Sequence, residues 1–581
     1  MPLSPIQRAT IDIFETSGFM KISRAMRTTR EKRLLLHDQF LEFMRLLKFV
    51  PDYHQKSYDL ILDLFEILHL LDVELVVKMA VQFNLWGETI YRLGTKKHLP
   101  YLTKTANLEI FGCFAMTEIG HGSNIAKLET TATYNYASDT FTINSPTYSS
   151  HKYWIGQAER FAQYAIVFAQ LYIRNVCYGV HPFIVQLRDI DTHELAHGIE
   201  IRDCGVKNGL NSIDNGEIIF DNVNISYNNL LDKFASINNG VYLSEKGRFS
   251  KMLNELTKNR FGLGEGCTII AKYHLKQTIQ YCSLRKQFGS GGQEKPIMEL
   301  PSHHKRLFPL LAKSILLKVY TTKQREYLDM QEESHISSII SKYMGSTLCL
   351  TTLRKCREAC GGHGYHADSR FGNVYKDMEI YTTFEGDNTV LLQQLFQNYL
   401  KQARPELNTR SILIYEGKKF HNRHIAGLDE CFFKHDFSIP MFLKNLTYII
   451  EYKVIHFMLL LREQFNLDMD PRILWRHRIN EILAVSTMIA VKHMLIDIME
   501  SERNIMTDYL IKLFIVDHIK THISFYAECI SSKQITNIHR YSETLYAKIY
   551  YHLDYYLYLL DVPDILFLTR TSHLNKLTSH L

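Results

Sequence analysis

The spacing of apolar residues changes along the chain and divides it into successive stretches. Up to about residue 110, apolar residues recur at three- and four-residue steps, the period of an amphipathic helix. The clearest run is Tyr58, Ile61, Leu62, Phe65, Leu68 and Leu71. The helical period returns from about 240 to 400, as in residues 269–281, and it continues from 405 to 581.

Between 113 and about 230 the pattern is different. Short runs rich in β-branched and aromatic residues are bounded by Gly, Asn and Asp, which is typical of strands. These runs predict strands at 128–134, 141–143, 164–171, 182–187 and 217–220, the first two joined by a turn at 137–139. The sequence therefore predicts an antiparallel β-domain between helical regions.

This order favours a multi-domain α+β protein. The predicted parts are an N-terminal helical domain (1–112), a central antiparallel β-domain with a binding cleft (113–235), a helical bundle (236–404) and an additional C-terminal helical domain (405–581). A β-domain between helical domains does not match the alternating strands and helices of a dinucleotide-binding fold. Gly262-Leu-Gly264-Glu-Gly266 lacks the GxGxxG spacing and follows no strand, so we expect these glycines to allow close helix packing.

Composition excludes several classes of protein. Apolar residues make up 46% and charged residues 22% of 581, which excludes disorder and a disulfide scaffold. The apolar stretch 60–83 is interrupted by charges, so no membrane span is expected. The net charge of +6 is spread along the chain without a run of like charges, and no nucleic-acid partner is expected.

The ten cysteines form no CxxC pair, which favours an intracellular protein with reduced thiols. Cys356 and Cys360 lie one helical turn apart with His363 nearby. Ordinary helix packing is favoured over a metal site there, because a metal would need a fourth ligand. We expect no metal.

The first segment that can carry chemistry is Cys113-Phe-Ala-Met-Thr-Glu-Ile-Gly-His-Gly-Ser-Asn124. Its glycines let backbone approach a ligand, and Thr117 and Ser123 offer hydroxyls for a flat ring or a phosphate. A surface turn is the alternative. Lys152-Tyr-Trp-Ile-Gly156 follows, and an aromatic residue near a glycine can wall a planar cofactor or simply end a buried strand.

The second segment is Arg285-Lys-Gln-Phe-Gly289, at the end of a helical run. A guanidinium there can bind a pyrophosphate with two parallel hydrogen bonds. A solvated helix terminus is the alternative, since cations are favoured at that end of a helix in any case.

The third segment joins Cys360-Gly-Gly-His-Gly-Tyr365 to Phe384-Glu-Gly-Asp-Asn-Thr-Val-Leu-Leu392. The glycines stop one helix, and Asn388 or Asp387 can cap the next. Glu385 lies in the turn before that helix, where an apolar pocket would raise its pKa toward that of a general base. Gly386 lets backbone N–H groups stabilise a developing enolate. Alternatively, Glu385 only favours the helix dipole.

Together, in this order, these segments resemble the acyl-CoA oxidases within the acyl-CoA dehydrogenase superfamily. The likeness runs from about Gly112 to Leu400 and includes Gly205-Val-Lys-Asn-Gly-Leu210 and Asp214-Asn-Gly216 as well as the motifs above. It implies an FAD enzyme that desaturates a fatty acyl-CoA to the trans-2-enoyl-CoA and reduces O2 to H2O2, the first step of peroxisomal β-oxidation.

The resemblance also implies roles for individual residues. Glu385 matches the catalytic base. Positions that match the family's FAD contacts are Thr117, Trp154, Gly156, Arg285 and Phe288, and Arg260 matches a position near the bound acyl-CoA. From its hydroxyl on the same loop as Thr117, Ser123 is also expected to bind FAD, and Gly386 is expected to contact the acyl-CoA through backbone N–H groups. Because Arg285 and Phe288 match a pair that reaches FAD across a subunit interface, a homodimer or a heterodimer with a related subunit is expected.

An oxidase is favoured over a dehydrogenase that passes electrons to another flavoprotein. Three features favour it: the long helical stretch after Glu385, the run Arg357-Glu-Ala-Cys-Gly-Gly-His-Gly364, and the C-terminal Ser579-His580-Leu581. That tripeptide resembles a peroxisomal address read by an import receptor. A non-catalytic partner subunit is a further alternative, because Pro301-Ser-His-His-Lys-Arg306 departs from the family pattern.

Overall fold

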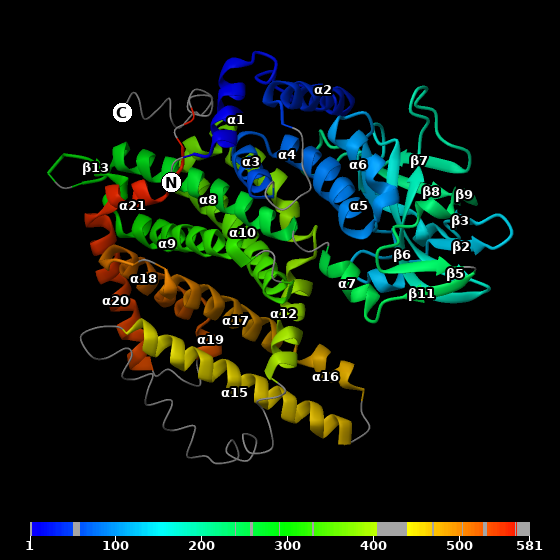
Figure 1. The fold of residues 1–581 in the computed structure, drawn as a ribbon. Coiled ribbons are helices and arrows are strands. Elements are labelled where there is room, and N and C mark those ends of the chain that lie inside the picture. The colour runs from blue at the N-terminus through cyan, green and yellow to red at the C-terminus, as the bar shows by residue number, and fades with distance from the viewer. Residues whose placement is uncertain are drawn as a thin grey trace. The chain divides into compact units, whose positions relative to one another are not determined.

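The computed structural model describes residues 3–49, 58–238, 240–255, 259–289, 291–327, 331–403, 438–466, 470–501, 503–526, 532–563 and 565 (Figure 1). The chain forms two compact units. Unit 1 comprises 1–262, 376–380 and 565–568, and unit 2 comprises 263–375, 381–564 and 569–581. The boundary predicted at 404/405 and the C-terminal tripeptide lie outside the described residues, and the finer division into four domains stays a prediction.

Unit 1 begins with helices, as the apolar period predicts. In α3, Ile61, Leu62, Phe65, Leu68 and Leu71 are all buried. The helices begin at residues suited to capping: Ser4 and Thr28 close capping boxes with Gln7 and Glu31. The helical elements are α1 (Pro5–Thr16), α2 (Thr29–Leu47), α3 (Tyr58–Leu71), α4 (Val73–Met79), a π-helix (Ala80–Gly87), α5 (Glu88–Leu93), α6 (Leu99–Ala106) and α7 (Arg248–Glu255).

The β part of unit 1 contains two sheets that share one apolar core, to which Phe141 and Val167 contribute from the first sheet and Ile155 and Phe220 from the second. The first sheet consists of β1 (Gly112–Ala115), β2 (Thr131–Asn135), β3 (Thr140–Asn144), β5 (Tyr164–Ile173), β6 (Val176–Gln186) and β9 (Val223–Ser226). The second consists of β4 (Lys152–Gly156), β7 (Ile199–Asp203) and β8 (Asn215–Phe220), and β10 (Ala235–Asn238) pairs with β11 (Val241–Ser244).

Most strand pairs are antiparallel, as predicted, including the β2–β3 hairpin and β5–β6. Two pairs differ from the prediction, because β1 and β2 both run parallel to β5. β1 pairs with residues 164–167 and β2 with residues 170–172 of β5. Parallel pairing requires a long crossover connection, which a search for local turns does not reveal.

Unit 2 is helical. The helices α10 (Gln331–Ala359), α17 (Ile479–Glu500) and α18 (Ile505–Thr521) all pack against α9 (Pro301–Gln324), as Figure 1 shows. The elements are α8 (Asn259–Leu284, which begins in unit 1), α9 (Pro301–Gln324), α10 (Gln331–Ala359), α11 (Phe371–Glu379, which ends in unit 1), α12 (Asn388–Ala403), α15 (Ile439–Asn466), α16 (Pro471–His477), α17 (Ile479–Glu500), α18 (Ile505–Thr521), α19 (Ile523–Tyr526), α20 (Ser532–Tyr551), α21 (Leu553–Leu559) and the hairpin β12 (Lys286–Gln287) and β13 (Lys295–Pro296).

Close helix packing at the glycine-rich start of α8 is confirmed. A Cβ atom on Gly264 would lie 2.5 Å from the Ser341 carbonyl oxygen of α10, and one on Gly345 would lie 2.7 Å from the Gly264 carbonyl oxygen. Only glycines at both positions allow the two backbones to come this close.

One helix bears on the prediction that no segment spans a membrane. Within the described residues, α17 alone has the length and apolar composition of a span, and 56% of its most apolar window is buried inside the protein. A core helix of a soluble protein has the same properties. The prediction of no membrane span therefore stays a prediction.

Candidate functional site

The loop after β1 is tied to β4, so the two segments predicted to hold a planar cofactor lie side by side in unit 1. Thr117 Oγ1 donates to the Tyr153 carbonyl (2.6 Å), and the Tyr153 N–H donates to the Thr117 carbonyl (3.0 Å). Farther along the loop, the Gly120 N–H donates to the Ser149 carbonyl (2.9 Å), and a Cβ atom on Gly120 would lie 3.0 Å from Ser149 Cβ. Thr117 is thereby placed opposite Tyr153, the residue before Trp154.

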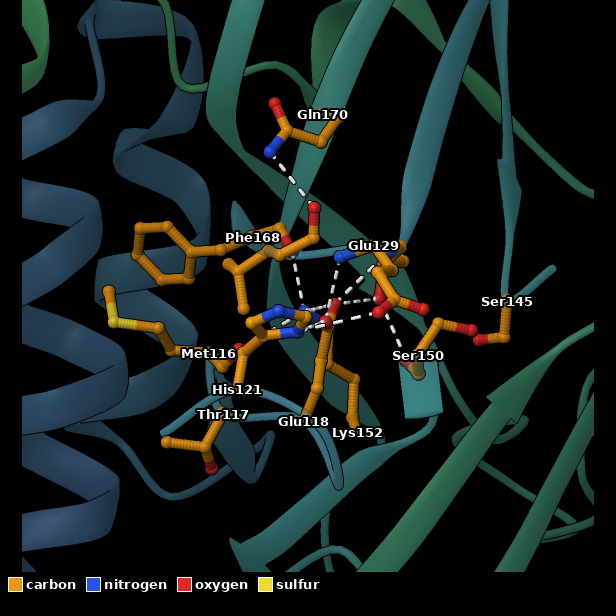
Figure 2. A network of polar contacts seen from close by, with 12 residues as sticks. Met116, Thr117, Glu118, His121, Glu129, Ser145, Ser150, Lys152, Phe168 and Gln170 are labelled. Carbon is orange, nitrogen blue, oxygen red and sulfur yellow. Dashed lines mark hydrogen bonds and ion pairs between the residues drawn. The ribbon is translucent and has the colours of Figure 1, made fainter. Parts of the chain in front are cut away.

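A buried ion pair lies beneath this loop (Figure 2). Lys152 Nζ lies 3.0 Å from Glu118 Oε1, and both side chains are fully buried. The ammonium also donates to the carbonyls of Phe168 (2.6 Å) and Met116 (3.1 Å). Burial lowers the pKa of Lys152 to about 8, and the nearby Glu118 carboxylate opposes that shift. The lysine therefore remains mostly charged at neutral pH.

The Glu118 carboxylate is equally well satisfied. It accepts from the backbone N–H groups of Glu129 (2.7 Å) and Thr130 (2.9 Å) and from Thr130 Oγ1 (2.6 Å). Figure 2 shows that Glu118 points into the network while the neighbouring Thr117 faces away from it. The pair holds both ends of the loop, which positions Thr117 and the start of β4.

Trp154 is held in an unusual backbone conformation with its ring exposed. Its φ of 69° lies in the left-handed region, which disfavours L side chains, and the residue is 56% exposed. Asn215 Nδ2 donates to the Trp154 carbonyl (2.8 Å), and Gly156 pairs with Asn215 between β4 and β8. Asn215 therefore stabilises the strained residue.

Two other contacts were predicted in unit 1. Ser123 is exposed on the loop after β1, and Arg260 is half-buried in the first turn of α8. The roles assigned to Ser123 and Arg260 stay predictions.

In unit 2, Arg285 and Phe288 lie together where α8 ends. The Arg285 N–H donates to the Tyr281 carbonyl (2.8 Å), which closes the last helical turn. Phe288 has a φ of 55° and is 73% exposed, in the connection between β12 and β13. The Lys295 N–H donates to the Phe288 carbonyl (2.8 Å) and holds this connection in place. A large apolar ring is thus presented to the outside of the unit.

The turn that carries Glu385 is confirmed as the start of α12. Glu385 is half-buried with a φ of 55°, and Gly386 follows with a φ of 104°. Of the two caps that the sequence left open, Asp387 is the side chain that caps: Oδ1 accepts from the N–H groups of Thr389 (2.9 Å) and Val390 (3.3 Å). Two successive positive φ values make this a sharp and strained turn.

Lys342 of α10 holds the same turn, and sequence reasoning missed it. It is 1% exposed, and its Nζ donates to the Gly386 carbonyl (2.6 Å) and to Asn388 Oδ1 (2.9 Å). Asn388 Nδ2 in turn donates to Ser346 Oγ (3.0 Å), one helical turn farther along α10. The available signal was one lysine inside an otherwise uncharged stretch of the helix, residues 336–353.

Glu118, Lys152 and Asn215 were missed in the same way. Each was part of a motif considered above, but no role was assigned to it. The signal for the ion pair was one acidic and one basic residue beside strands that are otherwise apolar.

The described part of the chain holds no group of three or more His, Cys, Asp and Glu side chains placed to bind a metal. Cys356 and Cys360 are buried, and Cys360 Sγ lies 3.8 Å from Thr278 Oγ1 of α8. This arrangement is the helix packing favoured from the sequence.

Comparison with known proteins gives two family matches. Residues 113–223 match the acyl-CoA dehydrogenase middle domain, and residues 253–400 match the acyl-CoA oxidase C-alpha1 domain. The chain is 37% identical over 393 residues to acyl-coenzyme A oxidase 2, peroxisomal, of Arabidopsis thaliana. The aligned region covers 64% of this chain and 56% of that protein. The chain is 34% identical over 361 residues to human peroxisomal acyl-coenzyme A oxidase 3. This alignment covers 58% of this chain and 51% of the human protein.

Solved structures extend the likeness of fold to nearly the whole chain. The acyl-CoA oxidase 3 structure from Yarrowia lipolytica matches with a TM-score of 0.85 at 24% identity, over 99% of this chain and 87% of that one. The Caenorhabditis elegans acyl-CoA oxidase-2, bound with FAD, ascaroside-CoA and ATP, matches with a TM-score of 0.83 at 20% identity, over 99% and 89%.

The sequence matches span just over half the length of the curated relatives, and the structural matches confirm the predicted multi-domain α+β fold. Both family domains follow one another in the expected order, over the same residues that carry the motifs. The chain is therefore similar to the acyl-CoA oxidases in sequence over these regions and in fold over nearly its whole length.

Proposed function

We propose that this chain is an FAD-dependent acyl-CoA oxidase that converts a fatty acyl-CoA to the trans-2-enoyl-CoA while O2 is reduced to H2O2. The observation that carries the proposal is the Glu385–Gly386 turn. It presents a half-buried carboxylate on a strained backbone directly before a helix N-terminus. Such a turn brings a base and backbone N–H donors to the same place.

The reaction needs both groups together. The α-proton of a thioester is weakly acidic, so a base removes it efficiently only when hydrogen-bond donors stabilise the negative charge that develops on the carbonyl oxygen. Glu385 accepts the proton on a carboxylate oxygen. Gly386 has no side chain to shield the adjacent N–H groups, which can therefore face the thioester oxygen. FAD, when bound, accepts the β-hydrogen as hydride and passes the electrons to oxygen.

The residues of unit 1 fit a planar cofactor. The Trp154 ring is exposed, Asn215 binds the Trp154 backbone carbonyl, and Thr117 is bonded to the neighbouring Tyr153. A Cβ atom on Gly122 would meet nothing within 4 Å, so this part of the loop is open on its outer side. In this proposal Thr117, Ser123, Trp154 and Gly156 hold FAD.

The remaining roles follow the family resemblance. Arg285 and Phe288 contact FAD from a second copy or a related subunit, which the exposure of Phe288 supports. Arg260 and Gly386 contact the acyl-CoA. We place the protein in the peroxisome, because the relatives it matches are named peroxisomal.

The test is anaerobic titration of the purified holoprotein with acyl-CoAs of several chain lengths, followed by admission of oxygen. We expect yellow protein whose flavin absorbance bleaches with acyl-CoA and recovers with one H2O2 per turnover. Glu385→Gln should abolish bleaching while FAD stays bound, whereas Glu379→Gln, at an exposed position on α11, should bleach normally.

Two outcomes would refute the proposal in different ways. Bleaching without oxygen consumption would identify a dehydrogenase that uses another electron acceptor. Colourless protein that remains so with added FAD would identify a non-catalytic partner subunit.

A further inference from the structure

We propose that Lys342 is a positioning residue for the catalytic base: its buried ammonium fixes the Glu385–Asn388 turn in the conformation that the reaction requires. This inference rests on the proposed function and deepens it. Lys342 lies on α10, and its Nζ contacts the chain on both sides of Asp387, at the Gly386 carbonyl (2.6 Å) and at Asn388 Oδ1 (2.9 Å).

The turn that carries Glu385 is strained. Glu385 and Gly386 have φ values of 55° and 104°, and the left-handed region is unfavourable for a residue with a side chain. Such a conformation persists only when surrounding contacts hold it. Asp387 caps α12 through Thr389 and Val390, but these bonds lie after the strained pair. The bond from Lys342 acts on Gly386 itself.

Lys342 also sets the direction of the peptide group between Gly386 and Asp387. In a trans peptide the carbonyl and the following N–H point in opposite directions. When the Gly386 carbonyl is bound to Lys342, the Asp387 N–H must point away from α10. The ammonium therefore sets the orientation of the peptide that follows the base. Charged donors also form stronger hydrogen bonds than neutral ones, which suits this task.

Lys342 is itself held in place by the packing of α10 against α8. Lys342 adjoins the point where α8 and α10 cross, at Ser341 and Gly345. Because Gly264 and Gly345 bring the two backbones into contact there, α10 has little freedom to shift. Ser346, one turn later, accepts from Asn388 Nδ2 (3.0 Å), so a second residue of α10 holds the same turn. Lys342 thus ties the turn that carries Glu385 to a helix crossing that has little freedom to move.

The test replaces Lys342 with Met, which keeps the length of the side chain and removes its donors. The matched control is Lys272→Met, since Lys272 is also buried in unit 2 (2% exposed) but donates to the Asp561 carbonyl. Flavin reduction by acyl-CoA is followed by stopped flow, and hydrogen exchange is measured for the peptide spanning 383–392. Exchange does not depend on turnover.

For Lys342→Met we expect a flavin-reduction rate constant about 100-fold lower, because displacing a reacting group by about 1 Å has an effect of this size. FAD content and the half-saturating acyl-CoA concentration should stay within threefold. Exchange over 383–392 should be faster than in the wild type. Lys272→Met should change neither the flavin-reduction rate constant nor the exchange over 383–392. Propylammonium added to Lys342→Ala should restore part of the rate, whereas propanol should not.

A folded Lys342→Met protein with a wild-type reduction rate or wild-type exchange over 383–392 would overturn the inference. If Lys342→Met does not fold, Asn388→Ala is measured in its place, because it removes one acceptor of the ammonium. Wild-type exchange over 383–392 in Asn388→Ala would also overturn the inference. A wild type that reduces no flavin would refute the proposed function instead, and the exchange comparison would still decide whether Lys342 holds the turn.

Discussion

Replacing Asp377 with Asn should stabilise unit 1 above neutral pH. Asp377 lies on α11, and its Oδ1 accepts from the Leu210 N–H (2.7 Å). Burial raises the pKa of this carboxyl from 3.8 to about 7, and the nearby Glu74 carboxylate adds to the shift. Glu74 is held close because it accepts from the Ser212 N–H (2.8 Å). The Glu74 and Asp72 carboxylates, both paired with Arg24, thus lie near the half-buried Asp377 carboxyl.

The size of the effect follows from the two pKa values. Each unit of pKa difference corresponds to about 1.36 kcal/mol, so a rise from 3.8 to about 7 amounts to about 4 kcal/mol. The folded state binds the proton more tightly than the unfolded state does. The stabilisation from the protonated form is therefore complete below pH 3.8, declines as the pH rises and is lost above pH 7. An Asn at 377 keeps the acceptor for Leu210 and carries no charge at any pH.

The assay is urea unfolding followed by tryptophan fluorescence between pH 4 and 8.5. In a Trp475→Phe background the remaining tryptophans, Trp86 and Trp154, both report on unit 1. We expect Asp377→Asn to equal the parent near pH 4 and to exceed it by about 4 kcal/mol at pH 8. Asp191→Asn, at an exposed position in unit 1, is the control. Equal stability of Asp377→Asn and its parent at pH 8 would refute the reasoning.

Two further substitutions, one in each unit, test how the units are packed. Lys152→Met should destabilise unit 1 by about 3–5 kcal/mol because it leaves Glu118 buried without its cation; urea unfolding measures this, and a loss below about 1 kcal/mol would contradict it. Gly264→Ala should destabilise unit 2 by about 1–3 kcal/mol, because its Cβ would lie 2.5 Å from the Ser341 carbonyl oxygen. Gly372→Ala, whose Cβ meets nothing within 4 Å, is the control in thermal unfolding, and equal midpoints would refute the predicted clash.

Local patterns in the sequence were sufficient for the order of helical and β regions, for the β2–β3 hairpin and for the start of α12. Each of these depends on residues close together in the chain. A helix shows its apolar period within a few turns, and a hairpin needs only two runs and a turn. The cap at Asp387 is likewise set by the next three residues.

The tertiary structure alone decided which distant residues meet. Glu118 and Lys152 are 34 residues apart, and Lys342 lies 44 residues before Gly386, so no local pattern pairs them. The parallel pairing of β1 and β2 with β5 also depends on crossovers through intervening strands. A buried charge is stable only where folding brings its partner within hydrogen-bond distance. The sequence can therefore show that such a charge exists, but only the folded chain shows which partner satisfies it.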